Sequence, residues 1–294
     1  MHLPASFIST IRSTFKEDGE KFLAVLPDLI AETSHRWELT DVQPVSNLSY
    51  NFVAFAKCGR EDVVLKLGVP NRELTSEIAA LKFFDGNGAC QLLESDAERG
   101  FLLLERLKPG EMLAELEDDD ERTNIAADLI LRRGGVTPPL QDTFIQLSDW
   151  FDGLKKIRPH FNGGTGPFPK KLLEQVESSL PELFADVPQL LHGDFHHFNI
   201  LSSERGWLVI DPKGVIGPAG YEVGPFMLNP WNSSMDGTQF ERRVSIFAER
   251  LGWERESIVK WSLAHAVLSA WWNIQDGMDY THAVRCAEMV SEIK

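Results

Sequence analysis

The sequence predicts an α+β protein in two lobes: a small antiparallel sheet with one inserted helix, then a larger helical lobe. Two observations support this prediction. From about residue 37 to residue 105, short apolar runs bounded by turn residues surround a single helical stretch, whereas most later apolar residues recur at helical spacing. The length of 294 residues is also sufficient for two modest lobes that bury a core.

The first lobe begins with residues 1–36, whose apolar side chains recur at roughly helical spacing. Gly19 and Pro27 interrupt that pattern, so we expect two helices rather than one. A helix is expected over residues 72–84, and the glycine-containing run that follows it is expected to end it. Strands are expected on both sides of a loop within 44–56, and at 63–68, 92–96 and 100–105.

Residues 105–110 change in composition and are expected to link the lobes, which assigns residues 1–104 to the first lobe and residues 111–294 to the second. An acidic run before residue 124 favours a helix N-terminus there. Most tryptophans near the C-terminal end are expected in the core. The second lobe should contain helices around 124–131, 147–158 and 172–183 and over most of 239–294, with breaks at 134–139 and 163–167.

One stretch combines reactive side chains with the apolar anchors of a compact loop. Residues 191–201 are Leu-His-Gly-Asp-Phe-His-His-Phe-Asn-Ile-Leu, and Leu-Val-Ile-Asp follows at 208–211 after a polar turn, which predicts a hairpin. The spacing His-x-Asp-x-x-x-x-Asn, with an Asp in the strand that follows, is the catalytic-loop pattern of phosphoryl transfer. In that chemistry Asp194 accepts the substrate hydroxyl proton, while Asn199 and Asp211 hold magnesium against a triphosphate.

Two other interpretations of this stretch are open. His192, His196 and His197 with Asp194 resemble the donor set of a zinc site, although no Cys lies nearby and the Asn and the distal Asp would have no role. A purely structural interpretation has Asp194 capping a turn and the later Asp ending a strand. In the kinase interpretation His192 shapes the loop, and the other two histidines receive no role.

The residues also resemble a known family. Residues 192–201 are similar to the HGDxHxxN signature of the aminoglycoside phosphotransferase-like kinases. The segments Ile-Asp-Pro-Lys-Gly at 210–214, Gly-Tyr-Glu-Val-Gly-Pro at 220–225 and Asn-Pro at 229–230 resemble the aminoglycoside/hydroxyurea resistance kinase subfamily, which includes the streptomycin 6-phosphotransferases. The resemblance covers nearly the whole chain.

This resemblance implies a two-lobed protein-kinase-like fold and an enzyme that is a small-molecule kinase. The implied reaction moves the γ-phosphoryl group of ATP, with Mg²⁺, to a hydroxyl of an aminoglycoside such as streptomycin, or to hydroxyurea, and so confers antibiotic resistance. Lys213 has no counterpart in the protein-kinase pattern, and a phosphate contact and a structural role are both open for it. Two rival functions are a kinase of the same fold for another small metabolite and a nucleotide-binding pseudokinase.

The resemblance also implies a nucleotide site in the first lobe. Lys66, embedded in an apolar strand, matches the strand lysine that contacts the α- and β-phosphates. Glu77 on the following helix is its expected carboxylate partner, with Glu73 in reserve. Each of these residues could instead belong to a solvated strand or helix face.

Two further segments are expected to contact the nucleotide. The loop within 44–56 occupies the place of the phosphate-covering loop but contains no glycine, and Ser46 and Asn47 are its small polar substitutes. The backbone of the linker, around Glu105 and Leu107, is expected to contact the adenine edge. As bare sequence, the loop would equally suit an ordinary hairpin turn.

Composition limits the partners and the location. The net charge of −15, from 44 acidic and 29 basic residues, argues against nucleic acid and is compatible with a cationic substrate. The acidic residues 118–120, Glu222 and Asp276 are available in the second lobe for such a substrate. No apolar run reaches the roughly 18 residues of a membrane helix, the start does not resemble a signal peptide, and three scattered cysteines suggest no disulfide framework. We therefore expect a cytoplasmic monomer or homodimer without a membrane partner.

Overall fold

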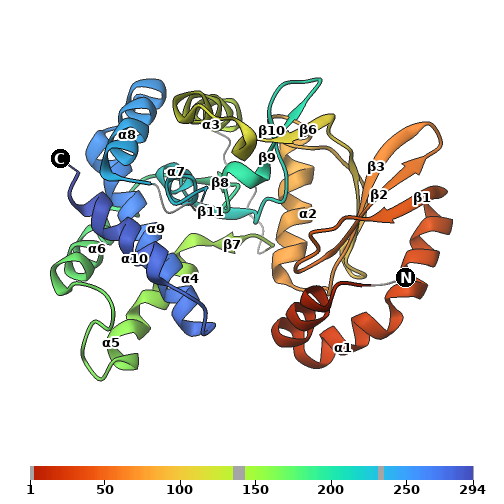
Figure 1. Cartoon of the computed structure of the whole chain (residues 1–294), viewed down its shortest axis with the longest axis horizontal. Coiled ribbons are helices and arrows are strands. Elements are labelled where there is room, and N and C mark those ends of the chain that lie inside the picture. Colours follow the sequence, from red (N-terminus) through yellow and green to blue (C-terminus); the bar gives the residue numbers. More distant parts are fainter. Residues whose placement is uncertain (1–2, 135–142, 231–234, 294) are drawn as a thin grey trace. The chain divides into compact units, whose positions relative to one another are not determined.

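A computed structural model describes residues 3–134, 143–230 and 235–293 of the chain. It divides into two compact units, the first ending at Lys108 and the second beginning at Pro109 (Figure 1). The predicted break at 134–139 lies outside the described residues except for Gly134, which directly follows a helix. No helix among the described residues combines the length and the apolar character that crossing a bilayer requires.

The first unit is built on an antiparallel sheet with the order β1-β2-β3-β5-β4. One helix, α2 (Arg72–Phe84), is inserted between β3 and β4, as the sequence predicted. Asn71 begins this helix by accepting the Leu74 N–H, and Asp85 ends it in a left-handed conformation. The strands are β1 (Leu39–Pro44), β2 (Phe52–Cys58), β3 (Glu61–Leu67), β4 (Leu92–Asp96) and β5 (Phe101–Glu105).

The chain begins with α1 (Ala5–Arg36), which is two helices joined at Lys16, where φ is 51° and ψ is −120°. The prediction of two helices is therefore confirmed, but the break lies at neither of the predicted residues. Gly19 permits a close approach after the break, since a β-carbon there would lie 2.4 Å from the Ile11 carbonyl oxygen. The second helix continues through Pro27.

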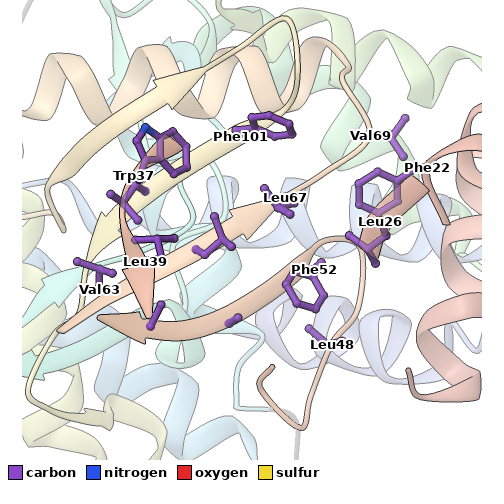
Figure 2. Close-up of a cluster of buried hydrophobic side chains, with 14 of the residues drawn as sticks. Phe22, Leu26, Trp37, Leu39, Leu48, Phe52, Val63, Leu67, Val69 and Phe101 are labelled. Carbon is purple, nitrogen blue, oxygen red and sulfur yellow. The ribbon is translucent and has the colours of Figure 1, made fainter. Parts of the chain in front are cut away.

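The core of the first unit lies between α1 and the sheet (Figure 2). Phe22 and Leu26 of α1 pack in one cluster with Phe52 of β2 and Leu67 of β3. Alternate residues of a strand face opposite sides of a sheet, so Lys66 faces away from this cluster. Its carboxylate partner lies on α2, which therefore covers the second face of the sheet (Figure 1).

The second unit is mainly helical and contains two small three-stranded sheets, with the orders β10-β9-β6 and β7-β11-β8. As predicted, Trp261 and Trp271 are buried, and both belong to its longest helix, α9. The predicted helix at 147–158 is divided into α4, a 3-10 turn and α5. The elements are β6 (Pro109–Met112), α3 (Asp119–Arg133), β7 (Ile145–Gln146), α4 (Leu147–Asp152), α5 (Ile157–His160), α6 (Lys170–Leu183), β8 (Pro188–Leu191), β9 (Ile200–Ser203), β10 (Leu208–Val209), β11 (Val215–Pro218), α7 (Val223–Met227), α8 (Gly237–Leu251), α9 (Arg255–Gln275) and α10 (Thr281–Ser291).

These sheets position the segment that resembled a catalytic loop. β8 leads into the loop, and the predicted hairpin follows as antiparallel β9 and β10. The chain then returns to β11, which pairs antiparallel with β8 so that Val215 lies opposite Leu191. Residues 192–199 follow the end of β8, and residues 210–214 precede the start of β11. Because the two strands are antiparallel, both segments lie at the same end of the pair, side by side.

Arg243 of α8 connects three helices of the second unit. Its side chain is fully buried and forms two hydrogen bonds, of 2.8 and 2.7 Å, with the carboxylate of Asp119 at the start of α3. Its Nη1 also donates to the carbonyls of Phe226, Met227 and Asn229 at the end of α7. Burial alone would raise the pKa of Asp119, but the hydrogen bonds and charge of Arg243 hold that pKa below its ordinary value.

We predict that Arg243→Met lowers the free energy of unfolding by about 3–5 kcal/mol, because it removes both close hydrogen bonds of a largely buried carboxylate and leaves it only the more distant charge of Arg122, at 3.8 Å. The matched control is Arg242→Met, since Arg242 pairs with Asp120 next to this site but is exposed. Urea unfolding followed by tryptophan fluorescence measures both variants, and equal midpoints would contradict the role given to Arg243.

Candidate active site

The first unit contains a buried ion pair at the predicted nucleotide position. Lys66 Nζ lies 2.6 and 2.8 Å from the two carboxylate oxygens of Glu77, and the two residues are 4% and 6% exposed. β3 presents Lys66 to the face that α2 covers, and Glu77 lies on the side of α2 that meets the sheet. The pairing expected from the resemblance is therefore present in the structure, whereas Glu73, the reserve, lies exposed in the first turn of the helix.

The loop between β1 and β2 presents its polar residues to solvent. Ser46 and Asn47 are exposed, and the buried Leu48 next to them anchors the loop in the core. The Val45 N–H donates to the Val53 carbonyl and closes the loop as a hairpin. Exposed donors on an anchored loop suit contact with a polar ligand, and they equally suit an ordinary turn.

The linker follows β5 directly. The Glu105 N–H donates to the Gln91 carbonyl, and the Glu105 carboxylate accepts the Gln91 N–H. Leu107 is 8% exposed, and its backbone N–H has no hydrogen-bond partner within the described part of the chain. Such a donor would need an acceptor from outside the described residues.

In the second unit, His192 holds the loop to the segment that precedes Asp211. Its Nε2 lies 2.8 Å from the Ile210 carbonyl and its Nδ1 lies 3.2 Å from the Asp194 N. A carbonyl only accepts and an N–H only donates, so the ring proton is on Nε2. Burial, followed by the positive charge of Arg133, lowers the pKa of His192 well below its ordinary value. His192 is therefore a neutral residue that shapes the loop, as the sequence suggested.

Asp194 and Asn199 lie next to each other in this loop. Asn199 Nδ2 donates to the Asp194 backbone carbonyl at 3.0 Å and lies 3.4 Å from Asp194 Oδ2. The Asn199 carbonyl accepts the Ile210 N–H at 2.9 Å, which holds the residue before Asp211 against the same turn. The Asp194 carboxylate is 38% exposed and thus accessible to a ligand. Hydrogen bonds therefore connect the chain segments that carry Asp194, Asn199 and Asp211, the three residues that the sequence predicted for the site.

Two backbone positions here adopt left-handed conformations. Gly193 has φ of 84°, and a β-carbon there would lie 2.5 Å from Val215 Cγ2, so only glycine fits between the loop and β11. Asp211 has φ of 60°, which is uncommon for a residue with a side chain. Such strain is concentrated at functional sites.

A buried carboxylate lies beneath the loop. Glu222 accepts the His192 N–H at 2.7 Å and the Gly193 N–H at 3.2 Å, and Arg133 Nη2 lies 3.3 Å from the same carboxylate. Glu222 is 4% exposed. The sequence offered Glu222 as a candidate contact for a cationic substrate, but the structure uses it to hold the loop. One feature of the sequence indicates this structural role: Glu222 belongs to the segment Gly-Tyr-Glu-Val-Gly-Pro at 220–225, which resembles the kinase subfamily.

Three of the other acidic candidates, residues 118–120, have structural partners as well. Asp118 caps α3, and Asp119 and Asp120 pair with Arg243 and Arg242. These three carboxylates therefore stabilise the start of a helix and its contact with α8. Asp276, after the end of α9, is exposed.

Within the described part of the chain, these histidines do not form a zinc site. His192 faces the Ile210 carbonyl, while the ring of His197 stacks on Phe226 with centroids 3.9 Å apart. Within residues 3–134, 143–230 and 235–293, no three His, Cys, Asp or Glu side chains group as metal ligands would. The donors gathered here are instead carboxylate and amide oxygens, which are the ligands of hard cations such as magnesium.

The profile of the aminoglycoside/hydroxyurea antibiotic resistance kinase family matches residues 36–277. The chain belongs to this family. It is 29% identical to streptomycin 6-kinase from Streptomyces glaucescens, with 94% of this chain and 92% of the relative covered. It is 30% identical to hydroxyurea phosphotransferase from Kitasatospora aureofaciens, with 94% and 82% covered. A member of this family is a small-molecule phosphotransferase with a hydroxyl acceptor, as the sequence predicted.

Solved structures confirm the predicted protein-kinase-like fold of this resistance kinase family member. The choline kinase LicA from Streptococcus pneumoniae has a TM-score of 0.62 at 15% identity, with 91% of this chain and 98% of that chain covered. Aminoglycoside phosphotransferase APH(4)-Ia has a TM-score of 0.60 at 16% identity, with 90% and 97% covered. At these identities the likeness concerns the fold alone.

We predict that Glu222→Gln lowers the free energy of unfolding by about 3–5 kcal/mol, because buried Arg133 loses its counter-charge. An amide also cannot accept both backbone N–H groups in the way that a carboxylate does. The exposed Asp276→Asn is the control in the same unit. Urea unfolding and amide hydrogen exchange at His192 and Gly193 are the measurements, and exchange as slow in Glu222→Gln as in the control would contradict the anchoring role.

Proposed function

We propose that this kinase transfers the γ-phosphoryl group of ATP, with Mg²⁺, to a hydroxyl of a cationic aminocyclitol such as streptomycin. The observation that carries the proposal is the hydrogen-bonded arrangement of Asp194 and Asn199, with Asp211 held next to it, in a chain of this family. Two relatives named as streptomycin 6-kinases, from Streptomyces glaucescens and Streptomyces griseus, favour the acceptor class. Hydroxyurea is the second candidate, because the Kitasatospora relative is named for it.

Asp194 is the proposed general base. Its partly exposed carboxylate would accept the proton of the acceptor hydroxyl as the new phosphate ester bond forms and the bond to ADP breaks. His192 and Asn199 hold the backbone on both sides of Asp194. A fixed backbone limits the carboxylate to a small region, and accurate positioning is the main demand of phosphoryl transfer.

Asn199 and Asp211 are the proposed magnesium ligands, and their geometry fits that role. Because Asn199 Nδ2 donates to a backbone carbonyl, which can only accept, the amide orientation is fixed and Oδ1 is the atom left for a cation. Asp211 contributes a carboxylate from a strained position beside it. When bound, magnesium neutralises charge on the phosphates. Both proposed ligands belong to the second unit.

The nucleotide-binding role proposed for the first unit rests on Lys66 and Glu77. Glu77 keeps the buried ammonium group in place, where it would contact the α- and β-phosphates. The exposed Ser46 and Asn47 would cover the phosphates. The Glu105 carbonyl and the Leu107 N–H would contact the adenine edge. On this proposal residues 1–104 bind nucleotide, residues 105–110 form the hinge, and residues 111–294 supply catalysis and the acceptor pocket.

We predict that Asp194→Asn lowers kcat by about 10²–10⁴-fold, the range typical of general-base catalysis, while magnesium-dependent ATP binding stays nearly intact. Asp211→Asn should lower kcat and also weaken magnesium-dependent ATP binding. Calorimetric titration with a non-hydrolysable ATP analogue measures binding, and coupled ADP release measures turnover. An Asp194→Asn enzyme within about twofold of wild type would contradict the base assignment, and a wild type that binds ATP without turnover would favour a pseudokinase.

We predict that kcat/KM for streptomycin falls as NaCl is raised to about 0.15 M, where the screening length is about 8 Å, since the chain carries a charge of −15. Hydroxyurea, which is uncharged, is the matched control and should respond little. Initial rates of ADP release measure both acceptors. Efficient turnover of neutral alcohols with streptomycin inert at millimolar concentration would overturn the acceptor and leave the phosphotransferase assignment in place.

A further inference from the structure

His196 lies in the loop beside Asp194, and the proposed mechanism gives it no role. Its ring is mostly buried, with 19% of the side chain exposed. Its Nε2 lies 3.5 Å from Asp194 Oδ1 and 3.5 Å from Asn199 Nδ2. The three side chains therefore form a triangle in which Asp194 faces His196 with one carboxylate oxygen and Asn199 with the other.

The backbone fixes the position of the ring proton of His196. The Phe198 N–H lies 3.3 Å from His196 Nδ1, and an N–H can only donate, so Nδ1 is an acceptor without a proton. The ring proton is therefore on Nε2, the atom that faces the Asp194 carboxylate. The distance of 3.5 Å is longer than a formed hydrogen bond. Hydrogen bonds of catalytic groups are often long before substrate binds and shorten in the substrate complex.

We propose that His196 is a positioning residue that holds the Asp194 carboxylate for reaction, an inference that rests on the proposed role of Asp194. In the substrate complex, where these contacts shorten, the His196 Nε2–H restrains Oδ1 while Asn199 Nδ2 restrains Oδ2. Without the His196 donor, the carboxylate would be restrained on one oxygen only and could rotate away from the acceptor hydroxyl. A misplacement of about 1 Å can cost about 10²-fold in rate.

A simpler structural role is also visible and must be separated from this one. By accepting the Phe198 N–H, His196 caps the short 3-10 turn His197–Asn199. Two substitutions divide the two functions of the ring. In His196→Asn the side-chain oxygen occupies the position of Nδ1 and keeps the cap, but no donor reaches Asp194. In His196→Gln the amide nitrogen occupies the position of Nε2 and keeps the donor, while the cap is lost.

The test compares wild type, His196→Asn and His196→Gln with ATP, magnesium and either streptomycin or hydroxyurea, whichever gives the higher wild-type rate. We expect His196→Asn to lower kcat by about 10- to 100-fold, with KM for ATP within about twofold, and His196→Gln to keep most of kcat. Equal losses in both variants, no loss in either, or a loss confined to His196→Gln would each overturn the positioning role. A wild type inactive on both acceptors would instead count against the proposed function.

A second measurement does not depend on turnover. The ¹⁵N chemical shifts of the His196 ring, assigned by comparison with His196→Gln, distinguish a proton on Nε2 from a proton on Nδ1. The proposal requires the Nε2–H form in the free enzyme. A ring protonated on Nδ1 alone would overturn the proposal whatever the kinetic result.

Discussion

The buried Glu222 carboxylate is the constraint on which the arrangement of the loop depends. The loop that turns back beneath Asp194 has backbone N–H groups pointing into the protein, where each must find an acceptor. Glu222 accepts two of them, from His192 and Gly193, while Arg133 balances its charge. Removing two charges from water is costly, so such a pair contributes more to a unique loop conformation than to net stability.

A second layer of packing supports the same loop from α7. Phe226 stacks against the ring of His197 and against Phe195, the residue after Asp194. Arg243 holds the carbonyls at the end of α7, including that of Phe226. Neither ring nitrogen of His197 has a hydrogen-bond partner among the described residues, and burial, then the charge of Arg243, lowers its pKa well below the ordinary value. His197 therefore serves as an uncharged packing residue.

Helix α3 connects these two supports. Asp119 at its first residue binds Arg243, and Arg133 at its last residue binds Glu222 and lies over the ring of Phe195 at 4.9 Å. One helix thus joins the ion pair beneath the loop to the ion pair behind α7. Neither support touches the proposed reacting atoms, yet both limit where the residues around Asp194 can lie.

The sequence predicted the features that depend on neighbouring residues. The strands and α2 follow from local apolar patterns, and a fixed spacing indicated the loop for which we propose a catalytic role. The expectation that Glu77 holds Lys66 came from the family resemblance, and the geometry agrees with it. Single-sequence patterns could not identify Glu222 or Arg243 as supports, because their partners lie far away along the chain. Arg133 is 89 residues from Glu222, and Asp119 is 124 residues from Arg243.

The same long-range pairing changes what the acidic composition implies about the acceptor. Net charge counts all carboxylates alike, yet Asp119, Asp120 and Glu222 are each paired with an arginine inside the second unit. Such carboxylates add little attraction of their own, because their partners cancel their fields at short range. The charge of −15 remains as a long-range field over the whole surface. Attraction of a cationic acceptor by that field would raise its rate of encounter, while recognition at the site would depend on shape and hydrogen bonds.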